Sequence, residues 1–340
     1  MNKCLAGVMA VVMLFAFAFT GNISYAAEDK INIVTTIFPV YDWVREIVGD
    51  SGNADITMLL DNGVDLHSFQ PTARDIMKVA TCDVFVYVGG ESDEWVEDAL
   101  EESVNPDMVV VNLVEAMGED IKMEEIVEGM EHDHDEDDDH DHDGEEHEHE
   151  ENDRDHEHDH EEADEHIWLS LRNAQKLVKV LAAALGEADP DNAETYNANV
   201  DSYIGRLAAM DGEYTAAREA ADLDTVLFGD RFPFRYLVDD YDLDYYAAFS
   251  GCSAESEASF ETVVFLAGKV DERGLSTVLT IEGTNHRIAE TIVENTRTKS
   301  AKVLTMDSMQ AITGEDVQNG ATYLGLMGSN LEVLKQALSK

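Results

Sequence analysis

Basic residues are scarce in this chain of 340 residues, which carries 22 Lys and Arg against 73 Asp and Glu. The formal net charge at pH 7 is therefore −51. A surface of this sign repels nucleic acids and anionic membranes, and it attracts cations. We therefore expect no nucleic-acid partner, and the charge indicates a cation as the ligand.

Cysteine is also rare, with three residues in the whole chain. Cys4 lies at the start of an N-terminal apolar run, which leaves Cys82 and Cys252 for the folded part. In an oxidising compartment these two thiols either pair across the two halves of the chain or stay separate and buried. The sequence leaves both alternatives open.

Long apolar runs are absent after the first 20 residues. The run Cys4–Thr20 follows a lysine and ends near the small-residue stretch Ser24–Ala27, a pattern typical of a secretory signal peptide. We predict that residues 1–26 are removed, the alternative being an uncleaved membrane anchor. Because Cys4 lies at the start of the apolar run and not at its end, no lipid anchor is predicted. The protein is expected to be periplasmic or otherwise extracytoplasmic.

Each half of the remaining chain alternates strand and helix patterns, which predicts an α/β fold with mainly parallel sheets covered on both faces. The predicted strands are Ile31–Val40, Ile56–Leu60, Asp83–Val88, Met108–Leu113, Thr225–Phe228, Tyr245–Ala248, Thr277–Ile281 and Lys302–Thr305. The predicted helices are Tyr41–Val48, Asp75–Ala80, Glu94–Glu102, Asn173–Leu185, Phe232–Val238, Ser259–Glu272, His286–Asn295 and Asn319–Leu338.

A further helical pattern runs from Asn192 to about Ala220 and separates the two halves. Its length of about 30 residues predicts a rigid span between lobes rather than a packed surface helix. We therefore predict an N-terminal lobe (27–189), a linking helix (190–221) and a C-terminal lobe (222–340). The ligand of two such lobes is expected in the cleft between them, at the carboxyl ends of the strands.

The tract 131–165 contains 22 acidic residues and one Arg, and it holds nine of the 12 histidines. With almost nothing apolar to bury, it is predicted to be a disordered loop. Imidazole is the commonest ligand for zinc, copper and nickel, so the tract predicts weak capture of several ions. A purely solvating acidic loop is the alternative, and it explains the acids but not the histidines. The accessory ligands are His132, His134, His140, His142, His147, His149, His156, His158 and His160.

Tight binding needs fixed ligands, and three histidines stand apart from the tract. His67 follows the predicted strand Ile56–Leu60, His166 stands where the tract ends, and His286 lies just beyond the strand Thr277–Ile281. Each one alone is more often an ordinary polar histidine than a ligand.

The surroundings of two of these histidines resemble the solute-binding proteins that serve zinc and manganese ABC transporters, of the zinc-importer type with a His-rich loop. Asp65–Thr72 is similar to the family motif D-P-H-x-[YF]-x-P-[ST], with Leu66 in place of proline. Asp164–Ala174 resembles D-P-H-x-W-x-[DS]-x-x-N-A, and Tyr323–Leu338 resembles the closing helix of the family. The resemblance covers essentially the whole mature chain.

The resemblance implies that His67 and His166 are the first two metal ligands and that Asp307 is a late ligand from the second lobe. The family's third histidine has no counterpart here, because Gly229 stands at its position. Asp230 is either the replacement ligand or the N-cap of the following helix. Glu282 and His286 are further candidate donors.

The predicted function is therefore capture of Zn²⁺, with Mn²⁺ as the alternative ion, and its delivery by a monomeric receptor to a membrane permease and its ATPase. A metal buffer or adhesin without a transporter is a second hypothesis. A zinc hydrolase is a third, but the chain contains no H-E-x-x-H and no evident general base beside His67 or His166, so we expect no enzyme.

Overall fold

The computed structural model describes residues 30–130, 163–253, 257–283 and 285–340. The predicted signal peptide and the nine histidines of the tract lie outside the described residues. Within the described residues, no helix has the length and apolar character needed to cross a membrane.

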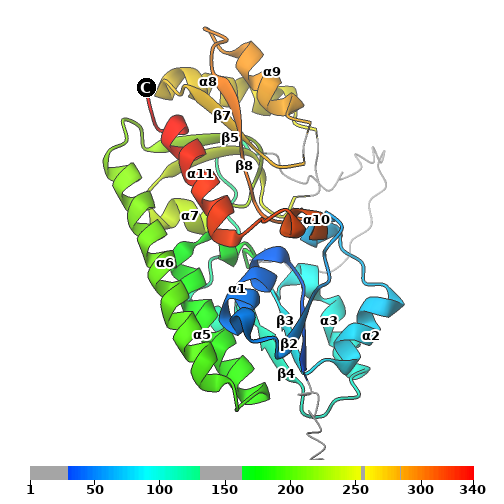
Figure 1. The fold of residues 1–340 in the computed structure, drawn as a ribbon. Helices are drawn as coiled ribbons and strands as arrows, with labels where there is room; N and C mark the ends of the chain where they lie inside the picture. The colour runs from blue at the N-terminus through cyan, green and yellow to red at the C-terminus, as the bar shows by residue number, and fades with distance from the viewer. Residues whose placement is uncertain (1–29, 131–162, 254–256, 284) are drawn as a thin grey trace, which may run out of the picture.

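The first sheet is parallel with strand order β2-β1-β3-β4 (Figure 1). Its strands are β1 (Ile31–Thr35), β2 (Ala54–Met58), β3 (Val84–Tyr87) and β4 (Val109–Asn112). The helices of this half are α1 (Phe38–Val48), α2 (Ala73–Thr81), α3 (Trp95–Glu101), α4 (Leu113–Met117) and α5 (Leu171–Ala188). Local sequence fixes their ends. Thr72 and Asp75, for example, form a reciprocal capping box at the start of α2.

The second sheet repeats this arrangement, with parallel order β6-β5-β7-β8. Its strands are β5 (Thr225–Phe232), β6 (Asp244–Ser250), β7 (Thr277–Ile281) and β8 (Lys302–Met306). The helices of this half are α7 (Arg235–Asp240), α8 (Phe260–Arg273), α9 (Arg287–Asn295), α10 (Gly314–Gln318) and α11 (Tyr323–Ala337). The predicted α/β class with two similar parallel-sheet lobes is confirmed.

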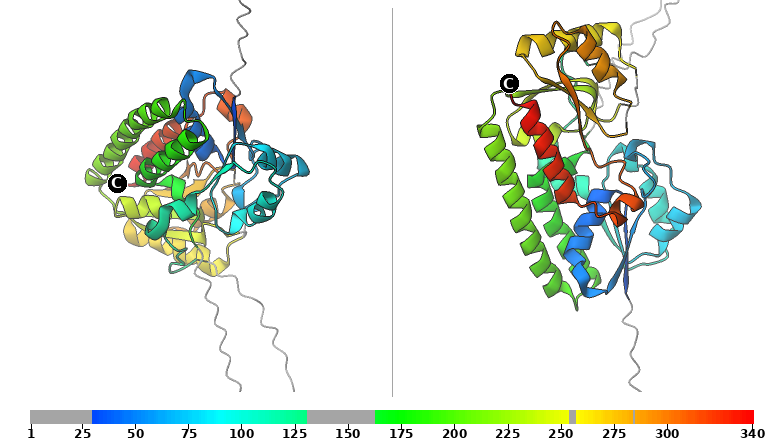
Figure 2. Two further views of the ribbon diagram at one scale, coloured as in Figure 1. Left: turned by 90° about the horizontal axis from the view of Figure 1, so that it is seen from below. Right: turned by 45° about the horizontal axis from the view of Figure 1, so that its top comes forward.

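The long helix α6 (Ala193–Glu219) runs beside α5 and past both sheets (Figures 1 and 2). It is the predicted long helix between the halves, but the expectation that it is not a packed helix is wrong. It buries one face at helical spacing, against α5, α1 and α11. The buried residues are Tyr196, Val200, Tyr203, Leu207 and Tyr214.

The two halves share one hydrophobic core. A single cluster of buried side chains contains Val34 and Phe85 from the first sheet together with Val226 and Leu279 from the second. The final helix α11 returns to the first half, where the backbone N–H of Tyr323 donates to Asp42 at 2.8 Å. The lobes are therefore joined by packing as well as by chain connections.

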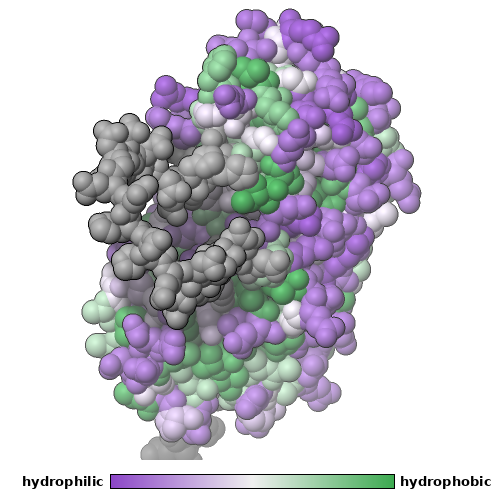
Figure 3. Space-filling view, turned by 180° about the vertical axis from the view of Figure 1, so that it is seen from behind, coloured by the Kyte–Doolittle hydropathy of each residue, from purple (hydrophilic) through white to green (hydrophobic). Residues whose placement is uncertain are grey.

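The outer surface is mainly polar. Hydrophilic residues dominate much of the visible part of one face in Figure 3. This distribution agrees with the large excess of acidic residues.

Candidate metal centre

His67 lies in the short 3₁₀ helix Leu66–Ser68, beyond the carboxyl end of β2. The carboxylate of Asp65 caps this turn and accepts a hydrogen bond from the His67 backbone N–H at 3.0 Å. The ring Nδ1 lies 2.7 Å from the Ser92 hydroxyl oxygen. Because Nδ1 is engaged, Nε2 is the ring nitrogen available to a ligand.

His166 is fully buried at the point where the chain resumes after the tract. Its Nδ1 lies 3.0 Å from Asp164 Oδ1, and its backbone N–H donates to the same oxygen at 2.9 Å. An ionised carboxylate accepts but cannot donate, so Nδ1 carries the proton and the lone pair stands at Nε2. Carboxylate–histidine pairs of this kind orient metal-binding imidazoles.

The Nε2 atoms of His67 and His166 face each other at 3.2 Å. Two nitrogens that bind one tetrahedral Zn²⁺ at about 2.05 Å lie about 3.3 Å apart. The observed separation therefore matches that of two ligands of a single ion, with both Nδ1 atoms engaged on the outer side of the rings.

Cys252 completes this group. One ligand atom from each of His67, His166 and Cys252 lies within 4.8 Å of the other two, and among the described residues no other group of three or more His, Cys, Asp or Glu side chains meets this test. Cys252 and Cys82 are both free thiols, so of the two alternatives the structure shows separate cysteines. Cys82 is buried elsewhere and donates to the Val79 carbonyl at 3.2 Å.

The two predicted aspartate ligands lie outside this group. Asp230 is a buried residue of β5, and its carboxylate accepts hydrogen bonds from the backbone N–H groups of Arg231 at 2.9 Å and Ile281 at 3.2 Å. The alternative role as an N-cap is wrong, because α7 starts five residues later and Phe234 is its N-cap. Asp307 accepts a hydrogen bond from the Met309 N–H at 2.8 Å.

The further candidate donors are also placed outside the group. The Glu282 carboxylate accepts from the backbone N–H and the hydroxyl of Ser308, each at 2.6 Å, and from the Gln310 N–H at 3.3 Å. His286 precedes α9 with a left-handed backbone conformation, φ 55°.

Electrostatics distinguishes the two imidazoles. Burial, reinforced by the charge of His166, lowers the pKa of His67 below its usual value. Burial also acts to lower the pKa of His166, but the Asp164 carboxylate outweighs it and the pKa is raised. His67 is therefore uncharged near neutral pH and available to a cation, whereas the Asp164 carboxylate makes protons stronger competitors for His166.

A cavity of about 240 Å³ opens beside the pair and is lined by His67, Ser92, Ala163, Glu165 and Cys252, among others. Glu165 Oε1 accepts a hydrogen bond from the Ser92 N–H at 2.9 Å. Its buried Oε2 has no hydrogen-bond partner among the described residues and lies 3.8 Å from His67 Nδ1. Burial raises the pKa of this carboxyl.

The close approach of Glu165 depends on Gly90, in the turn after β3. A Cβ at this position would lie 2.3 Å from Glu165 Oε1, and the backbone has φ 86°. Glycine satisfies both conditions.

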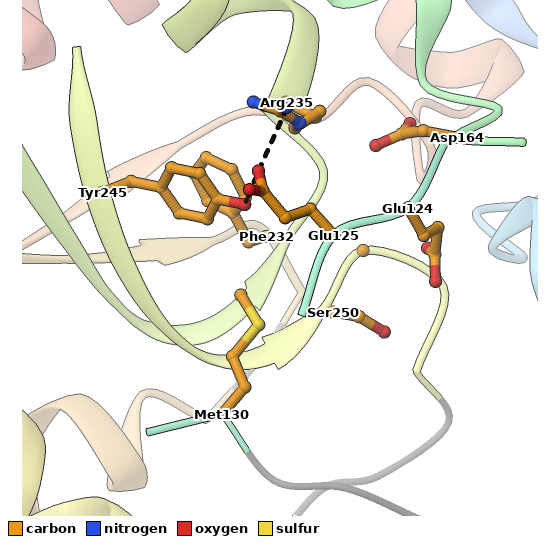
Figure 4. A pocket seen from close by; sticks show the side chains of 9 residues that line it. Glu124, Glu125, Met130, Asp164, Phe232, Arg235, Tyr245 and Ser250 are labelled. Atoms are coloured by element: carbon orange, nitrogen blue, oxygen red, sulfur yellow. Dashed lines mark hydrogen bonds and ion pairs between the residues drawn. The ribbon is translucent and has the colours of Figure 1, made fainter. Parts of the chain in front are cut away.

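A second, small pocket lies beside Asp164 and is lined mainly by polar and acidic side chains (Figure 4). Glu124 and Glu125 extend into it from one segment, Ser250 marks the end of β6, and Arg235 pairs with Glu125 at 3.1 Å. Acidic side chains thus also lie beside Asp164, the hydrogen-bond partner of His166.

Sequence reasoning missed Cys252. A signal was present, because Gly251 and Cys252 directly follow β6, as the turn of His67 follows β2. The search for isolated donors beyond strand ends considered histidines but did not include this cysteine.

Comparisons with known proteins identify the family of the chain. The model of the family described as zinc-uptake complex component A, periplasmic, matches residues 33–337. The chain is 28% identical over 340 residues to the zinc-binding protein AdcA of Streptococcus pyogenes, covering 98% of this chain and 61% of that protein. It therefore spans about three fifths of the length of this relative.

The chain is also 30% identical over 311 residues to the high-affinity zinc uptake system protein ZnuA of Bacillus subtilis, covering 91% of this chain and 88% of that protein. The crystal structure of the metal-dependent lipoprotein YcdH from Bacillus subtilis superposes with a TM-score of 0.70 at 26% identity, covering 91% of this chain and 99% of that one.

Proposed function

Because the chain belongs to the family of periplasmic component A proteins of zinc-uptake complexes, we propose that it captures Zn²⁺ outside the cytoplasm for an ABC importer. The partners in this proposal are a membrane permease and its ATPase. The family supplies a transport component rather than an enzyme, in agreement with the absence of H-E-x-x-H from the sequence.

The observation that carries the proposal is the 3.2 Å separation between the Nε2 atoms of His67 and His166. Asp164 and Ser92 engage the outer nitrogens, so the two Nε2 atoms are directed at one point before an ion arrives. Such preorganisation reduces the ordering cost of binding. Imidazole nitrogen is a good ligand for zinc, whereas manganese favours carboxylate, carbonyl and water oxygens, so the pair favours zinc over the manganese alternative.

Zinc titration calorimetry on the full-length protein tests this proposal. We expect one tight event plus weaker ones from the His-rich tract, and the variants His67→Ala and His166→Ala should each lose the tight event. The matched control is His286→Ala, which removes the remaining isolated histidine and should leave the tight event intact. Tight binding that survives both ligand substitutions would refute the site.

Deletion of residues 131–161 separates the tract from the centre. The deletion should remove only the weak events, because the paired imidazoles lie outside the deleted stretch. Loss of the tight event on deletion would contradict a preformed centre. Growth under zinc chelation of a strain that lacks the whole protein then separates transport from buffering, since a pure buffer is dispensable when zinc is limiting.

A further inference from the structure

We infer that Cys252 is the third metal ligand, a thiolate supplied by the C-terminal sheet, and that the centre is therefore a His₂Cys site selective for thiophilic ions. The inference rests on the proposed zinc-binding function. It replaces the aspartates expected from the sequence with a sulfur ligand.

The first support is position. Cys252 lies two residues beyond the end of β6, and its ligand atom is within 4.8 Å of those of both histidines. Its backbone N–H donates to Glu124 Oε1 at 3.0 Å, which fixes the loop to a segment that lines one pocket together with Asp164. The thiol thus faces the imidazole pair on an anchored backbone.

The second support is the residue before it. A Cβ on Gly251 would lie 2.9 Å from His166 Cε1, 3.2 Å from His166 Nδ1 and 3.0 Å from the Phe232 carbonyl oxygen. A side chain there would displace the loop from the ring. Glycine allows the backbone to pack directly on His166, and this packing brings Cys252 within reach of the two nitrogens.

The third support is the engagement of the other C-terminal donors. Arg231, on β5, forms an ion pair with Asp65 at 2.6 Å. Its guanidinium group therefore occupies the place beside His67 that faces β5. Asp230 and Asp307 accept backbone hydrogen bonds within their own lobe. Among the described residues, Cys252 is the C-terminal donor that joins the histidines.

The charge and softness of this ligand set define the class of ion. Two neutral imidazoles and one thiolate bring a single negative charge, and the buried Glu165 lies in the same cavity to balance a divalent ion further. Thiolate and imidazole suit Zn²⁺, Co²⁺ and Cd²⁺, whereas Mn²⁺ prefers oxygen. Three protein ligands leave a fourth tetrahedral position open to water. This open position favours the later release of the ion.

Cobalt spectroscopy provides the decisive test, because Co²⁺ replaces Zn²⁺ and gives a thiolate-to-metal charge-transfer absorption. The tract contains no cysteine, so its histidines and carboxylates cannot produce this band. We expect the band in the full-length mature protein and in the control Cys82→Ala. The variant Cys252→Ser should lose it, together with at least ~100-fold in zinc affinity, since loss of even an outer-sphere partner typically costs 10–100-fold.

Two further variants guard against a folding artefact and against the aspartate alternative. Cys252→His should recover tight zinc binding without the band, because it restores a ligand without sulfur. Asp307→Asn should keep both the band and the affinity. If Asp307→Asn lost zinc affinity while Cys252→Ser kept it, the assignment of Cys252 as a thiolate ligand would be overturned.

The outcomes also separate this inference from the proposed function. Tight zinc binding in wild type with no charge-transfer band leaves the zinc receptor standing and refutes Cys252 as a ligand. Failure of wild type to bind zinc tightly refutes the receptor itself.

Discussion

Replacement of Asp93 by Asn should stabilise the protein progressively as the pH rises. Asp93 is buried in the turn after β3, where one carboxylate oxygen accepts hydrogen bonds from the N–H groups of Val88 and Gly89, both at 2.9 Å. Burial raises its pKa to about 7, and the nearby Glu165 carboxylate adds to the shift. An Asn amide oxygen accepts the same two bonds without a charge.

The magnitude follows from linkage. A folded-state pKa near 7 against 3.8 in the unfolded chain means that the folded protein holds a proton that the unfolded one has lost. The resulting stabilisation is complete below the unfolded pKa, and it is lost as pH rises through the folded pKa. At 1.36 kcal/mol per unit, about 3 kcal/mol of the free energy of unfolding is lost between about pH 5 and pH 8. The Asn variant lacks this loss.

Urea denaturation of both proteins at intervals over this pH range measures the effect. The difference in unfolding free energy between Asp93→Asn and wild type should grow with pH by roughly 3 kcal/mol, while Asp98→Asn, at an exposed position of α3, should show a flat difference. A flat difference for Asp93→Asn as well would refute the reasoning. Zinc affinity should change little, because the turn that carries Ser92 keeps its hydrogen bonds.

Three other changes have defined outcomes. The rise in melting temperature on zinc addition should be larger at about pH 8 than at about pH 5.5, because protons compete for His166, whose pKa is raised. Gly251→Ala should lower zinc affinity about 10-fold in calorimetry, since its Cβ would press on His166, whereas Gly268→Ala, with open space around its Cβ, should not. Tyr323→Phe removes a buried hydrogen bond of 2.7 Å to the Trp168 carbonyl, and urea denaturation should show a loss of about 1–2 kcal/mol.

The fold was accessible from sequence because its strands are short apolar runs that end in turn residues. Val84–Tyr87 and Thr277–Ile281, for example, lie almost wholly within the core and were both predicted as strands. Packing decided the rest. Helix α6 was expected to be a rigid span rather than a packed surface helix, yet it buries three tyrosines on one face, against α5, α1 and α11. Local sequence does not encode which distant helices will meet.

The site could be predicted only in part from the sequence, for a similar reason. His67 and His166 each stand in a recognisable local motif, and the structure brings their rings together. Cys252 has no such motif, and its contact with the histidines depends on how the second sheet packs against the first. The helix expected to begin at Phe232 suggested an N-cap role for Asp230. Instead, β5 extends through Phe232, and the Asp230 carboxylate accepts a hydrogen bond from the backbone N–H of Ile281 in β7.

The shared core constrains how an ion reaches this centre. One hydrophobic cluster contains Val34 and Val226 from the two halves, and the 2.6 Å ion pair between Arg231 and Asp65 also joins them, so wide separation of the halves would disrupt these contacts. Exposure of apolar surface costs about 25 cal/mol per Å², so wide opening of the lobes is expensive. The cavity that both Ala163 and His67 line reaches the ring without separating the sheets. We therefore expect the ion to exchange through this cavity while the core stays closed.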